Sequence, residues 1–446
     1  MRLFLIFFLM GIEELYKIFK QCERITTDSR DCPAGSLFFA LKGASFDGNR
    51  FAQAALDKGC SYAIVDEKEY ATSEKTILVD DVLKTLQQLA HYHRMQLGTK
   101  IICVTGTNGK TTTKELLTAV LKEKYNVMST QGNLNNEIGV PKTLLTLTAD
   151  HDIAVVEAGA SHPGDIKILV DIIEPDYGII TNVGKAHLQG FGSFEGVLHT
   201  KGELYDYLRT KSDSKIFINS GDSNLMSISD GLEKICYHVE GDERYNDILP
   251  LVEGCVVTCD PLLHIRWKTA QGEENIIDSH LIGSYNIYNM LAAACVGTFF
   301  DVTAAQVTHA LNSYVPTNNR SELEKTAHNT LIVDAYNANP TSMMAALKNF
   351  RGIEANKKMV ILGDMKELGE SSMEEHQKVV QYVTDSHFDK VWLVGDEFKK
   401  AANSHVTCFD DVQQVKDRLK QETVENHLIL IKGSNSTKLY ELKSIL

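Results

Sequence analysis

A glycine-rich turn between a predicted strand and a predicted helix constrains this chain more than any other feature. The apolar run 101–104 predicts a buried strand, and residues 113–121 have the pattern of a helix. Between them the chain reads Thr105-Gly106-Thr107-Asn108-Gly109-Lys110-Thr111-Thr112. A strand, a glycine turn and a helix in this order point backbone N–H groups and the positive end of the helix dipole at one spot, where an anion can bind. The segment therefore predicts a phosphate-binding loop in an α/β protein.

Two side chains of this loop extend the prediction to ATP. Lys110 would bring a cation to the phosphates, and Thr111 a hydroxyl that can ligate the Mg²⁺ that accompanies ATP. Val104 stands where the general pattern G-x-x-x-x-G-K-[ST] has its first glycine, so the match is imperfect. A tight turn in an α/β core is the structural alternative. The candidate ATP-binding residues here are Gly106, Thr107, Asn108, Gly109, Lys110, Thr111 and Thr112.

Length, charge and cysteine content limit the kind of protein. The chain has 446 residues, more than one hydrophobic core usually supports, which predicts two or three domains. The net charge of −14 argues against a general binder of nucleic acid or of anionic membranes. The nine cysteines are scattered and lack the paired spacing of a zinc site, as expected for free thiols in a reducing compartment. We therefore expect a cytoplasmic protein, and we expect it to be a monomer.

The first residues need a separate interpretation. Residues 3–10 are apolar and follow Arg2, like the central region of a signal peptide. The run is shorter than the roughly 20 residues that span a bilayer, and an amphipathic helix begins directly after it. We hypothesise that residues 1–9 are an upstream-start artefact, that synthesis begins at Met10, and that the chain has no stable membrane insertion.

Hydrophobic patterns divide the chain near residues 99 and 313. Strand and helix patterns alternate through the middle segment, which indicates a parallel sheet with crossover helices. The last segment repeats buried-strand runs, several of which end in Gly or Asp. The predicted strands are 37–41, 101–104, 153–157, 178–181, 331–334, 359–364, 391–396 and 428–431, with a β-rich insert at 255–267 and helices at 12–20, 285–300 and 304–314. The predicted fold is α/β with three domains: a small α/β N-terminal domain (1–99), a central P-loop domain with a parallel sheet (100–313) and a C-terminal Rossmann-like domain (314–446).

Three further side chains are candidates for the same site. Glu157 ends a predicted strand, where a carboxylate can hold Mg²⁺, although a helix cap or a structural carboxylate is the alternative. His187 follows the next predicted strand, and by itself such a histidine is more often structural. Lys201 has the pattern of a solvated helix lysine, and no spacing rule distinguishes it.

A family resemblance changes the interpretation of these residues. The segments 105–112, 133–141, 156–160 and 181–187 together resemble the Mur ligase family, as do 28–30, 39–43, 334–340 and 362–369. The resemblance implies an ATP-dependent ligase that joins D-alanyl-D-alanine to UDP-N-acetylmuramoyl-tripeptide in peptidoglycan precursor synthesis. The ligase that adds the third amino acid and the folylpolyglutamate-type ligases remain alternatives within the family. A P-loop ATPase of another class and a non-catalytic nucleotide-binding protein remain alternatives outside it.

The resemblance also implies a mechanism and its residues. The γ-phosphate of ATP passes to the terminal carboxylate of the tripeptide, and the amine of D-alanyl-D-alanine attacks the acyl phosphate. Two Mg²⁺ ions are implied, one held by Thr111 and Glu157 and a second held by His187 and a carbamylated Lys201. Lys110 neutralises phosphate charge. The catalytic residues implied are Lys110, Glu157, His187 and Lys201, and the general base for the amine stays open.

The remaining roles implied by the resemblance concern the two nucleotides. Asn286 and Asn289 would lie near adenine, and Arg320 and Asp334 would close over the phosphate and ribose of ATP. Asn135 and Asn136 would face the muramoyl-peptide carboxylate, although such loops are commonly just turns. UDP would be held by Asp28, Ser29, Arg30, Lys42, Asp47 and Gly48, which read alone could also be turn residues. The third residue of the acceptor peptide and the extent of domain closure stay open.

Overall fold

The computed structural model describes residues 10–245, 247–272, 274–316 and 320–446. These residues form two compact units. The first unit holds the chain up to residue 103 together with 125–159 and 165–176, and the second holds 104–124, 160–164 and 177–446. The hypothesis about residues 1–9 falls outside the described residues, and the domain boundaries near 99 and 313 stay predictions. Within the described ranges, no helix combines the length and the apolar composition that crossing a membrane requires.

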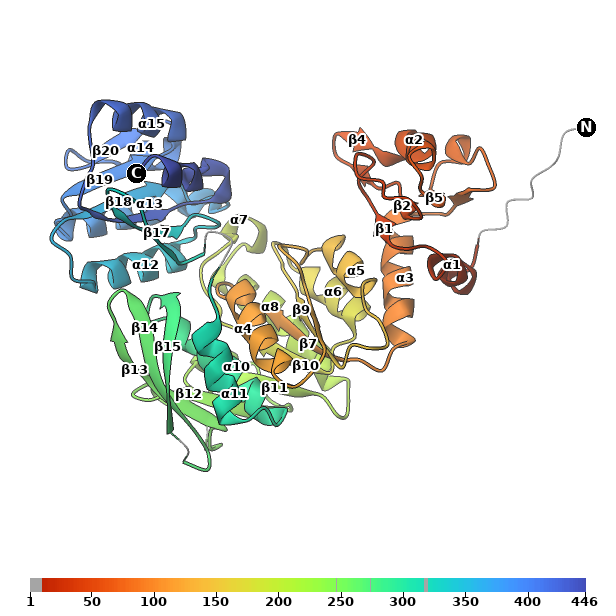
Figure 1. The fold of residues 1–446 in the computed structure, drawn as a ribbon, viewed down its shortest axis with the longest axis horizontal. Helices are drawn as coiled ribbons and strands as arrows, with labels where there is room; N and C mark the ends of the chain where they lie inside the picture. The colour runs from red at the N-terminus through yellow and green to blue at the C-terminus, as the bar shows by residue number, and fades with distance from the viewer. Residues whose placement is uncertain (1–9, 246, 273, 317–319) are drawn as a thin grey trace, which may run out of the picture. The chain divides into compact units, whose positions relative to one another are not determined.

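The first unit begins with a small sheet that is parallel throughout, in the strand order β1-β2-β5-β6 (Figure 1). Phe38 and Ala63 belong to its buried core, and a two-residue hairpin, β3–β4, follows β2. The elements are α1 (Ile12–Phe19), β1 (Ile25–Thr26), β2 (Leu37–Phe39), β3 (Lys42–Gly43), β4 (Phe46–Asp47), α2 (Ala52–Asp57), β5 (Tyr62–Val65), β6 (Thr76–Leu78) and α3 (Val82–Met95). The predicted helix at 12–20 and the predicted strand at 37–41 are confirmed, each with a slightly earlier end.

Helix α3 connects this sheet to the rest of the first unit. It begins at Asp81, whose carboxylate accepts a hydrogen bond from the Lys84 backbone N–H at 2.8 Å. Its last turn is buried against α5 (Gly139–Leu144) and α6 (Asp165–Ile173). There the Arg94 guanidinium donates to the Ile173 carbonyl at 3.2 Å and forms an ion pair with Asp176. The same unit contains β8 (Val127–Ser129) and β9 (Ile153–Glu157), which pair in parallel, and β7 (Lys100–Thr105) continues from it into the second unit.

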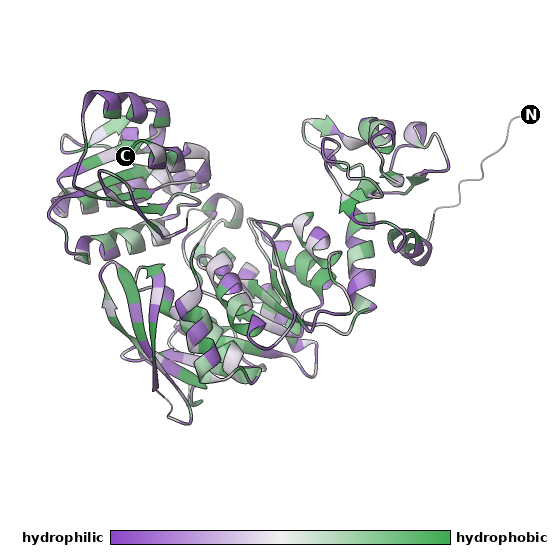
Figure 2. Ribbon diagram, viewed as in Figure 1, coloured by the Kyte–Doolittle hydropathy of each residue, from purple (hydrophilic) through white to green (hydrophobic). Residues whose placement is uncertain are grey.

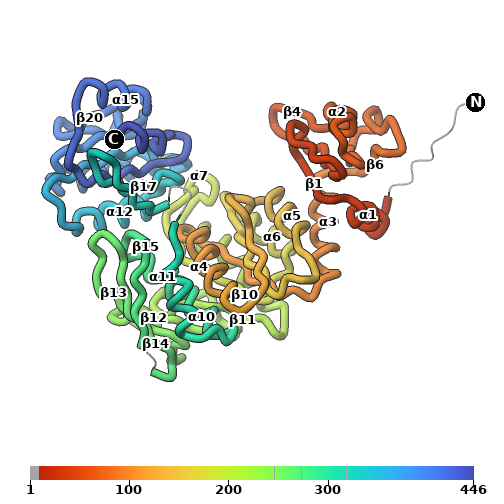
Figure 3. Tube along the Cα trace, in the orientation of Figure 1, coloured from red at the N-terminus to blue at the C-terminus, as the bar shows by residue number. Residues whose placement is uncertain are grey.

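The second unit carries a parallel array that becomes antiparallel at one side. Strands β10 to β13 pair in parallel in chain order, and β13, β14 and β15 pair antiparallel. Helix α10 is buried on almost every side because it packs against α4, β12 and β13 (Figure 3). The elements are α4 (Lys110–Lys122), β10 (Tyr177–Ile180), α7 (Leu188–Phe191), α8 (Phe194–Arg209), β11 (Lys215–Asn219), α9 (Ser223–Ser227), β12 (Glu233–Val239), β13 (Val252–Cys259), β14 (Leu262–Thr269), β15 (Glu274–Ile282), α10 (Asn286–Phe299) and α11 (Ala304–Ser313). The predicted β-rich insert is confirmed as β13–β15, whereas β11 and β12 were not predicted.

The last part of the second unit is a six-stranded sheet in the order β16-β17-β21-β18-β19-β20. Only its edge strand β16 is antiparallel among the described pairings. Alternate residues of the same strands enter different cores: Ile332 and Leu430 pack under α12 and α13, whereas Leu331 and Ile429 pack with α15. The strands accordingly have hydrophobic residues on both faces (Figure 2). The elements are β16 (Glu322–Lys325), β17 (Thr330–Asp334), α12 (Pro340–Gly352), β18 (Lys358–Gly363), α13 (Ser372–Asp385), β19 (Lys390–Val394), α14 (Asp396–Ala401), β20 (Thr407–Phe409), α15 (Val412–Gln421) and β21 (Leu428–Lys432).

The predicted α/β class with parallel sheets is confirmed by these pairings. Because β17, β21, β18 and β19 are parallel, their carboxyl ends meet at one edge of the last sheet. Asp334 and Lys432 end two adjacent strands at this edge and are in register with each other. The edge therefore brings charged side chains together that are far apart in the sequence.

The buried face of β14 gives a test of the second unit's packing. Trp267 is fully buried there, and its indole N–H donates to the Thr308 hydroxyl at 3.3 Å. We expect Trp267→Ala to lower the free energy of unfolding by about 3–5 kcal/mol, because the cavity cannot fully collapse in a packed sheet. Urea unfolding followed by circular dichroism measures this loss. Val257→Ala on exposed β13 is the control, with a change within about 0.5 kcal/mol, and equal losses in both variants would contradict the assignment.

Candidate active site

The predicted phosphate loop has the backbone geometry that such a loop requires. It connects β7, which ends at Thr105, to α4, which begins at Lys110. Gly109 precedes the helix with a φ of +78°, and Gly106 has a φ of +136°. A Cβ on Gly106 would lie 2.1 Å from the Thr181 hydroxyl oxygen, so both the backbone conformation and the close approach exclude a side chain here. The N-terminus of a 13-residue helix thus opens onto the loop.

A second loop, residues 181–184, holds the phosphate loop in this conformation. The Thr107 N–H donates to the Asn182 carbonyl at 2.9 Å, and the Asn108 N–H donates to the Asn182 side-chain oxygen at 3.1 Å. In return, the Thr181 hydroxyl donates to the Asn108 carbonyl at 2.6 Å, and the Gly184 N–H donates to the Thr107 hydroxyl at 2.9 Å. These four bonds fix the backbone on the β10 side of the loop before any ligand binds.

Lys110 and two asparagines contact different parts of the loop. The Lys110 ammonium donates to the Gly106 carbonyl at 2.8 Å and to the Thr107 carbonyl at 3.1 Å, so its charge lies over the loop. Asn289 is buried against Gly109, and its side-chain oxygen accepts from the Thr113 hydroxyl at 3.1 Å. Asn286 is buried beside it and accepts from the Asn289 amide at 2.8 Å. This geometry gives both asparagines a supporting role under α4, and their predicted contact with adenine stays a prediction.

His187 and Lys201 both lie near the Phe191 ring. The His187 ring is 6.2 Å from the Phe191 ring, and the Lys201 ammonium is 5.3 Å from the Phe191 centroid. His187 contacts Glu367, and burial lowers the pKa of His187 more than this carboxylate raises it. The imidazole is therefore neutral at pH 7, which is the form that binds a metal.

Lys201 lies deeper in the second unit than its sequence pattern predicts. It is 2 % exposed, and its ammonium lies 3.5 Å from the Ala160 carbonyl oxygen. The interpretation of Lys201 as a solvated helix lysine is therefore wrong, because α8 turns this position into the core. The burial of Lys201 is observed, whereas its predicted conversion into a carbamate stays a prediction.

Glu157 is the buried carboxylate of the first unit. It ends β9, is 1 % exposed, and accepts a hydrogen bond from the Asn135 amide at 2.7 Å. The Asn135 carbonyl accepts from the Gly159 N–H at 2.7 Å, which ties the asparagine loop to the segment after β9. Asn136 has a different role, since its side-chain oxygen accepts from the Gly139 N–H at 2.8 Å at the start of α5. Sequence reasoning correctly placed Glu157 at a strand end, and the structure adds Asn135 as its partner.

The donor set fits magnesium better than a transition metal. Across the ranges that the structure describes, no three His, Cys, Asp or Glu side chains gather as a metal-binding group. Magnesium in ATP sites is commonly held by one or two protein oxygens together with phosphates and water, so a protein cage is not required. The Thr111 hydroxyl and the Glu157 carboxylate are oxygen donors, and the His187 ring offers a nitrogen. Glu157 belongs to the first unit and the other two residues to the second, so their role as magnesium ligands stays a prediction.

The carboxyl edge of the last sheet brings further predicted residues toward the phosphate loop. The Arg320 guanidinium stacks on the Tyr336 ring at 3.9 Å from its centroid. Asp334 pairs with Lys432, their charged atoms 2.5 Å apart. Asn339 begins α12, and its amide donates to the Asn108 side-chain oxygen of the phosphate loop at 2.7 Å. A hydrogen bond thus links α12 directly to the phosphate loop.

The predicted UDP-binding residues lie after β1 and β2 of the first unit: residues 28–30 in the loop after β1, Lys42 and Asp47 in the β3–β4 hairpin, and Gly48 directly after it. Strands β1 and β2 are parallel neighbours, so both loops emerge at the same edge of the small sheet. The Arg30 guanidinium donates to both Asp28 carboxylate oxygens and holds the pKa of Asp28 well below its usual range. The Ser29 carbonyl accepts from the Lys58 ammonium at 2.6 Å.

The loop after β2 has a fixed conformation as well. Asp66 and Glu67 each lie 2.9 Å from the Lys42 ammonium and raise the pKa of Lys42. Asp47 accepts from the Asn49 N–H at 3.0 Å, and a Cβ on Gly48 would lie 2.3 Å from the Leu41 carbonyl oxygen. Lys42 and Arg30 are thus already paired with carboxylates, so the UDP-binding role of this set stays a prediction.

Sequence reasoning missed four residues that the structure places at the site. Thr181 and Asn182 belong to a segment that carries the family resemblance, but only His187 in it was assigned a role, and their contacts depend on β10 lying beside the phosphate loop. Asn339 was predictable as a helix cap, since Pro340 follows it at the first helical position. Lys432 carries no local signal beyond its place at the end of a strand.

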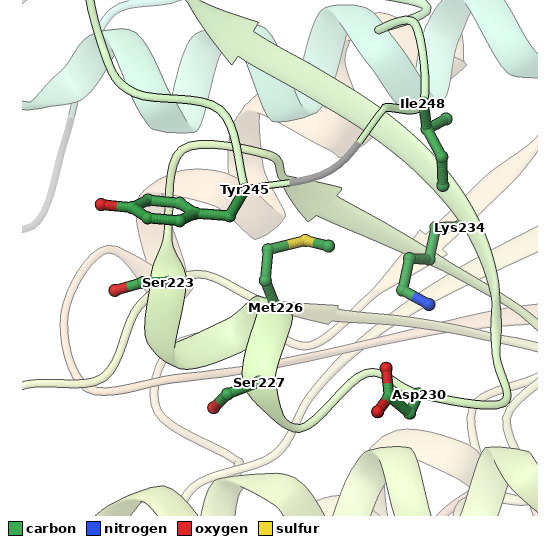
Figure 4. Close-up of a pocket in the computed structure, with 7 residues that line it drawn as sticks. All are labelled: Ser223, Met226, Ser227, Asp230, Lys234, Tyr245 and Ile248. Carbon is green, nitrogen blue, oxygen red and sulfur yellow. The ribbon is translucent and has the colours of Figure 1, made fainter.

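A cavity elsewhere in the second unit contains none of these residues. Its volume is about 370 Å³, and it lies between α9, the start of β12 and the segment before β13 (Figure 4). Its lining residues are Ser223, Met226, Ser227, Asp230, Lys234, Tyr245 and Ile248. The predicted active site therefore does not coincide with this cavity.

The fold and the phosphate loop together define a P-loop nucleotide-binding α/β protein. Three family models match consecutive parts of the chain: "Mur ligase family, catalytic domain" at residues 21–94, "Mur ligase middle domain" at 104–297 and "Mur ligase, glutamate ligase domain" at 319–435. The chain belongs to the Mur ligase family.

Individual relatives agree with this family over nearly the whole chain. The UDP-N-acetylmuramoyl-tripeptide--D-alanyl-D-alanine ligase of Bacillus subtilis (strain 168) is 35% identical over 94% of this chain and 92% of its own. A crystal structure of MurF from Acinetobacter baumannii has a TM-score of 0.85 at 28% identity, covering 97% of this chain and 98% of its own. MurF of Thermotoga maritima in complex with ADP has a TM-score of 0.84 at 25% identity, covering 96% and 97%. These similarities confirm the predicted family and three-domain architecture.

The close approach at Gly106 gives a test of the loop. We expect Gly106→Ala to weaken ADP binding by at least about tenfold, equivalent to about 1.4 kcal/mol, because the added methyl group must displace Thr181 and the backbone around it. Isothermal titration calorimetry with Mg-ADP measures the loss. Gly352→Ala is the control, since a Cβ there meets nothing within 4 Å. Wild-type affinity in Gly106→Ala would refute the assignment of this loop to nucleotide binding.

Proposed function

We propose that this protein joins D-alanyl-D-alanine to UDP-N-acetylmuramoyl-tripeptide, using ATP and releasing ADP and phosphate, in peptidoglycan precursor synthesis. The observation that carries the proposal is the preformed phosphate loop with Lys110 above it, in a chain that aligns with ligases of this name along nearly all of its length. The predicted function, an ATP-dependent ADP-forming ligase, follows from this agreement of site and family. The scattered cysteines, expected as free thiols in a reducing compartment, support a cytoplasmic location for the protein. The monomeric state stays a prediction.

The first chemical step is phosphoryl transfer to a carboxylate. A carboxylate oxygen of the tripeptide forms a bond to the γ-phosphorus of ATP while the bond to the ADP oxygen breaks, which yields an acyl phosphate and ADP. Lys110 and the α4 N-terminus would stabilise the negative charge on the phosphoryl oxygens. Two magnesium ions are part of the proposal, and when bound they would supply further neutralisation of this charge. Thr111 and Glu157 would hold one ion, and His187 and carbamylated Lys201 the other.

The second step forms the amide. The amine nitrogen of D-alanyl-D-alanine attacks the acyl carbon, the bond to the phosphate oxygen breaks, and the amine loses a proton as phosphate leaves. The chain's part in this step is to hold the two substrates in line and to exclude water, since water would hydrolyse the acyl phosphate. Asn135 would orient the peptide carboxylate next to Glu157, to which its amide is already bonded. The residues after β1 and β2 would bind the UDP end of the substrate.

The proposed substrates give the principal test. We expect purified protein with Mg-ATP and UDP-N-acetylmuramoyl-tripeptide to form an amide with D-alanyl-D-alanine, and at least about 100-fold less with single amino acids, because the dipeptide's second residue adds contacts and positions the amine. Mass spectrometry of the product and phosphate release measure the reaction. Phosphate release that does not depend on the tripeptide would instead indicate a P-loop ATPase of another class.

The choice of amine separates the alternatives within the family. Preference for a single amino acid would identify the ligase that adds the third residue and would overturn the proposal. Lys110→Ala is the inactive control, since it removes the cation over the phosphate loop. Comparison of tripeptides that contain lysine or diaminopimelate would then define the acceptor.

The proposed carbamate on Lys201 can be tested by chemical rescue. We expect Lys201→Ala to lower kcat by at least about 100-fold, as loss of one group that stabilises the transition state does. Added formate or acetate should restore part of the rate, because a short carboxylate replaces the missing oxygen donors. Lys211→Ala, two residues after the end of α8, should keep full activity with no response to carboxylates. Failure of every short carboxylic acid to raise the Lys201→Ala rate would argue for an ammonium at this position.

A further inference from the structure

A buried ion pair connects two strands at the carboxyl edge of the last sheet. Lys432 ends β21 and is 1 % exposed, and its ammonium lies 2.5 Å from an Asp334 carboxylate oxygen at the end of β17. The two residues are direct partners in the register of these parallel strands. The Asp334 side chain keeps 18 % of its surface exposed. One carboxylate oxygen is thus held from inside the sheet, while the side chain still reaches the surface.

The same ammonium also holds the loop that follows Asp334. It donates to the Asn337 carbonyl at 3.3 Å. Two residues later, Asn339 bonds to Asn108 of the phosphate loop. Between these contacts, Tyr336 receives the Arg320 guanidinium on its ring. Lys432 therefore holds Asp334 and Asn337, which form the first part of a short path that leads through Asn339 to the phosphate loop.

A second carboxylate at this edge of the sheet, that of Asp364, gives a comparison with a structural role. Asp364 follows β18, is 1 % exposed, and accepts from the backbone N–H groups of Glu397 and Phe398 at the start of α14. Its oxygens cap α14, and the half-exposed Lys366 ammonium lies 3.5 Å from one of them, whereas the cation beside Asp334 is the buried ammonium of Lys432. A buried ion pair adds little net stability, because both charges lose their hydration. Stability alone therefore does not account for a lysine at position 432.

We propose that Lys432 is a positioning residue that orients the Asp334 carboxylate toward the ribose hydroxyls of the bound nucleotide. The inference rests on the proposed function and on the predicted role of Asp334, which would close over the ribose of ATP. The Lys432 ammonium holds the Asp334 carboxylate and, through the Asn337 carbonyl, the loop that follows it. Because Lys432 is 1 % exposed, we assign it no direct contact with the nucleotide, and it acts through Asp334.

Binding of nucleotides with and without ribose hydroxyls tests this role directly. The ligands are Mg-ADP and Mg-2′,3′-dideoxy-ADP, titrated by calorimetry into wild type, Lys432→Met, Asp334→Asn and the double variant. We expect wild type to prefer ADP by about tenfold or more, as the loss of a charge-assisted hydrogen bond predicts. Lys432→Met should reduce this preference to below about threefold, because a carboxylate without its partner is no longer held in place. Lys432→Arg, which keeps a cation, should retain part of the preference.

A matched lysine controls for general loss of charge in the same sheet. Lys443 forms ion pairs with Glu322 at 3.0 Å and Glu324 at 2.9 Å on β16. We expect Lys443→Met to keep the wild-type preference for ADP, whatever its effect on melting temperature. Equal preference in Lys432→Met and Lys443→Met would overturn the inference, as would a wild type that does not distinguish the two nucleotides.

Lys432→Met leaves the Asp334 carboxylate without its cationic partner, which can destabilise this variant. The double variant, Lys432→Met with Asp334→Asn, keeps the test decisive in that case. It removes both charges, and its affinities should equal those of Asp334→Asn, because a positioning residue has no effect once its target is gone. Affinity losses that add in the double variant would overturn the inference. Ligase activity is measured separately, so a wild type that binds ADP but makes no amide would refute the proposed function and leave the comparison at Lys432 intact.

Discussion

The hydrogen bonds between the phosphate loop and residues 181–184 are the constraint on which the active site depends. A glycine-rich loop has many backbone conformations in isolation, and ordering it costs free energy. Here the loop is ordered when the protein folds, because Thr107 and Asn108 donate hydrogen bonds to Asn182 and the Thr181 hydroxyl donates to the Asn108 carbonyl. The loop is therefore prepared for an anion before one arrives, which is the condition for electrostatic stabilisation of a phosphoryl transfer.

The same principle extends to the last sheet. Its parallel strands end at one edge, where Asp334 and Lys432 pair, and Asn339 carries the connection to Asn108. Arg320 is held on Tyr336 rather than left to sample many rotamers. Each predicted nucleotide-binding side chain of this segment thus has a second residue that limits its freedom. Phosphoryl transfer depends on the precise positioning of a few groups rather than on a deep apolar pocket.

Much of the fold was predictable because its signals are local. The periodicity of buried strands and amphipathic helices is a property of short segments, and the predicted helix at 285–300 and strand at 153–157 were found within one residue of their ends. Strands β11 and β12 were missed because their apolar runs are short and follow turn residues. The local pattern gave the wrong burial for Lys201 for a different reason. The helix pattern around Lys201 is ordinary, and only the burial of its side chain in the second unit distinguishes it.

The sequence by itself determined the α/β class, the phosphate loop and the family, since each depends on residue types at fixed local spacing. Glycines at 106 and 109 stand where the backbone takes a positive φ, and the glycine pattern itself is visible in the local sequence. Only the tertiary structure decided which side chains support the site. Thr181 meets Asn108 across 73 residues, and Lys432 meets Asp334 across 98. Such contacts arise from the order of strands in a sheet, and no local pattern encodes which strand ends become neighbours.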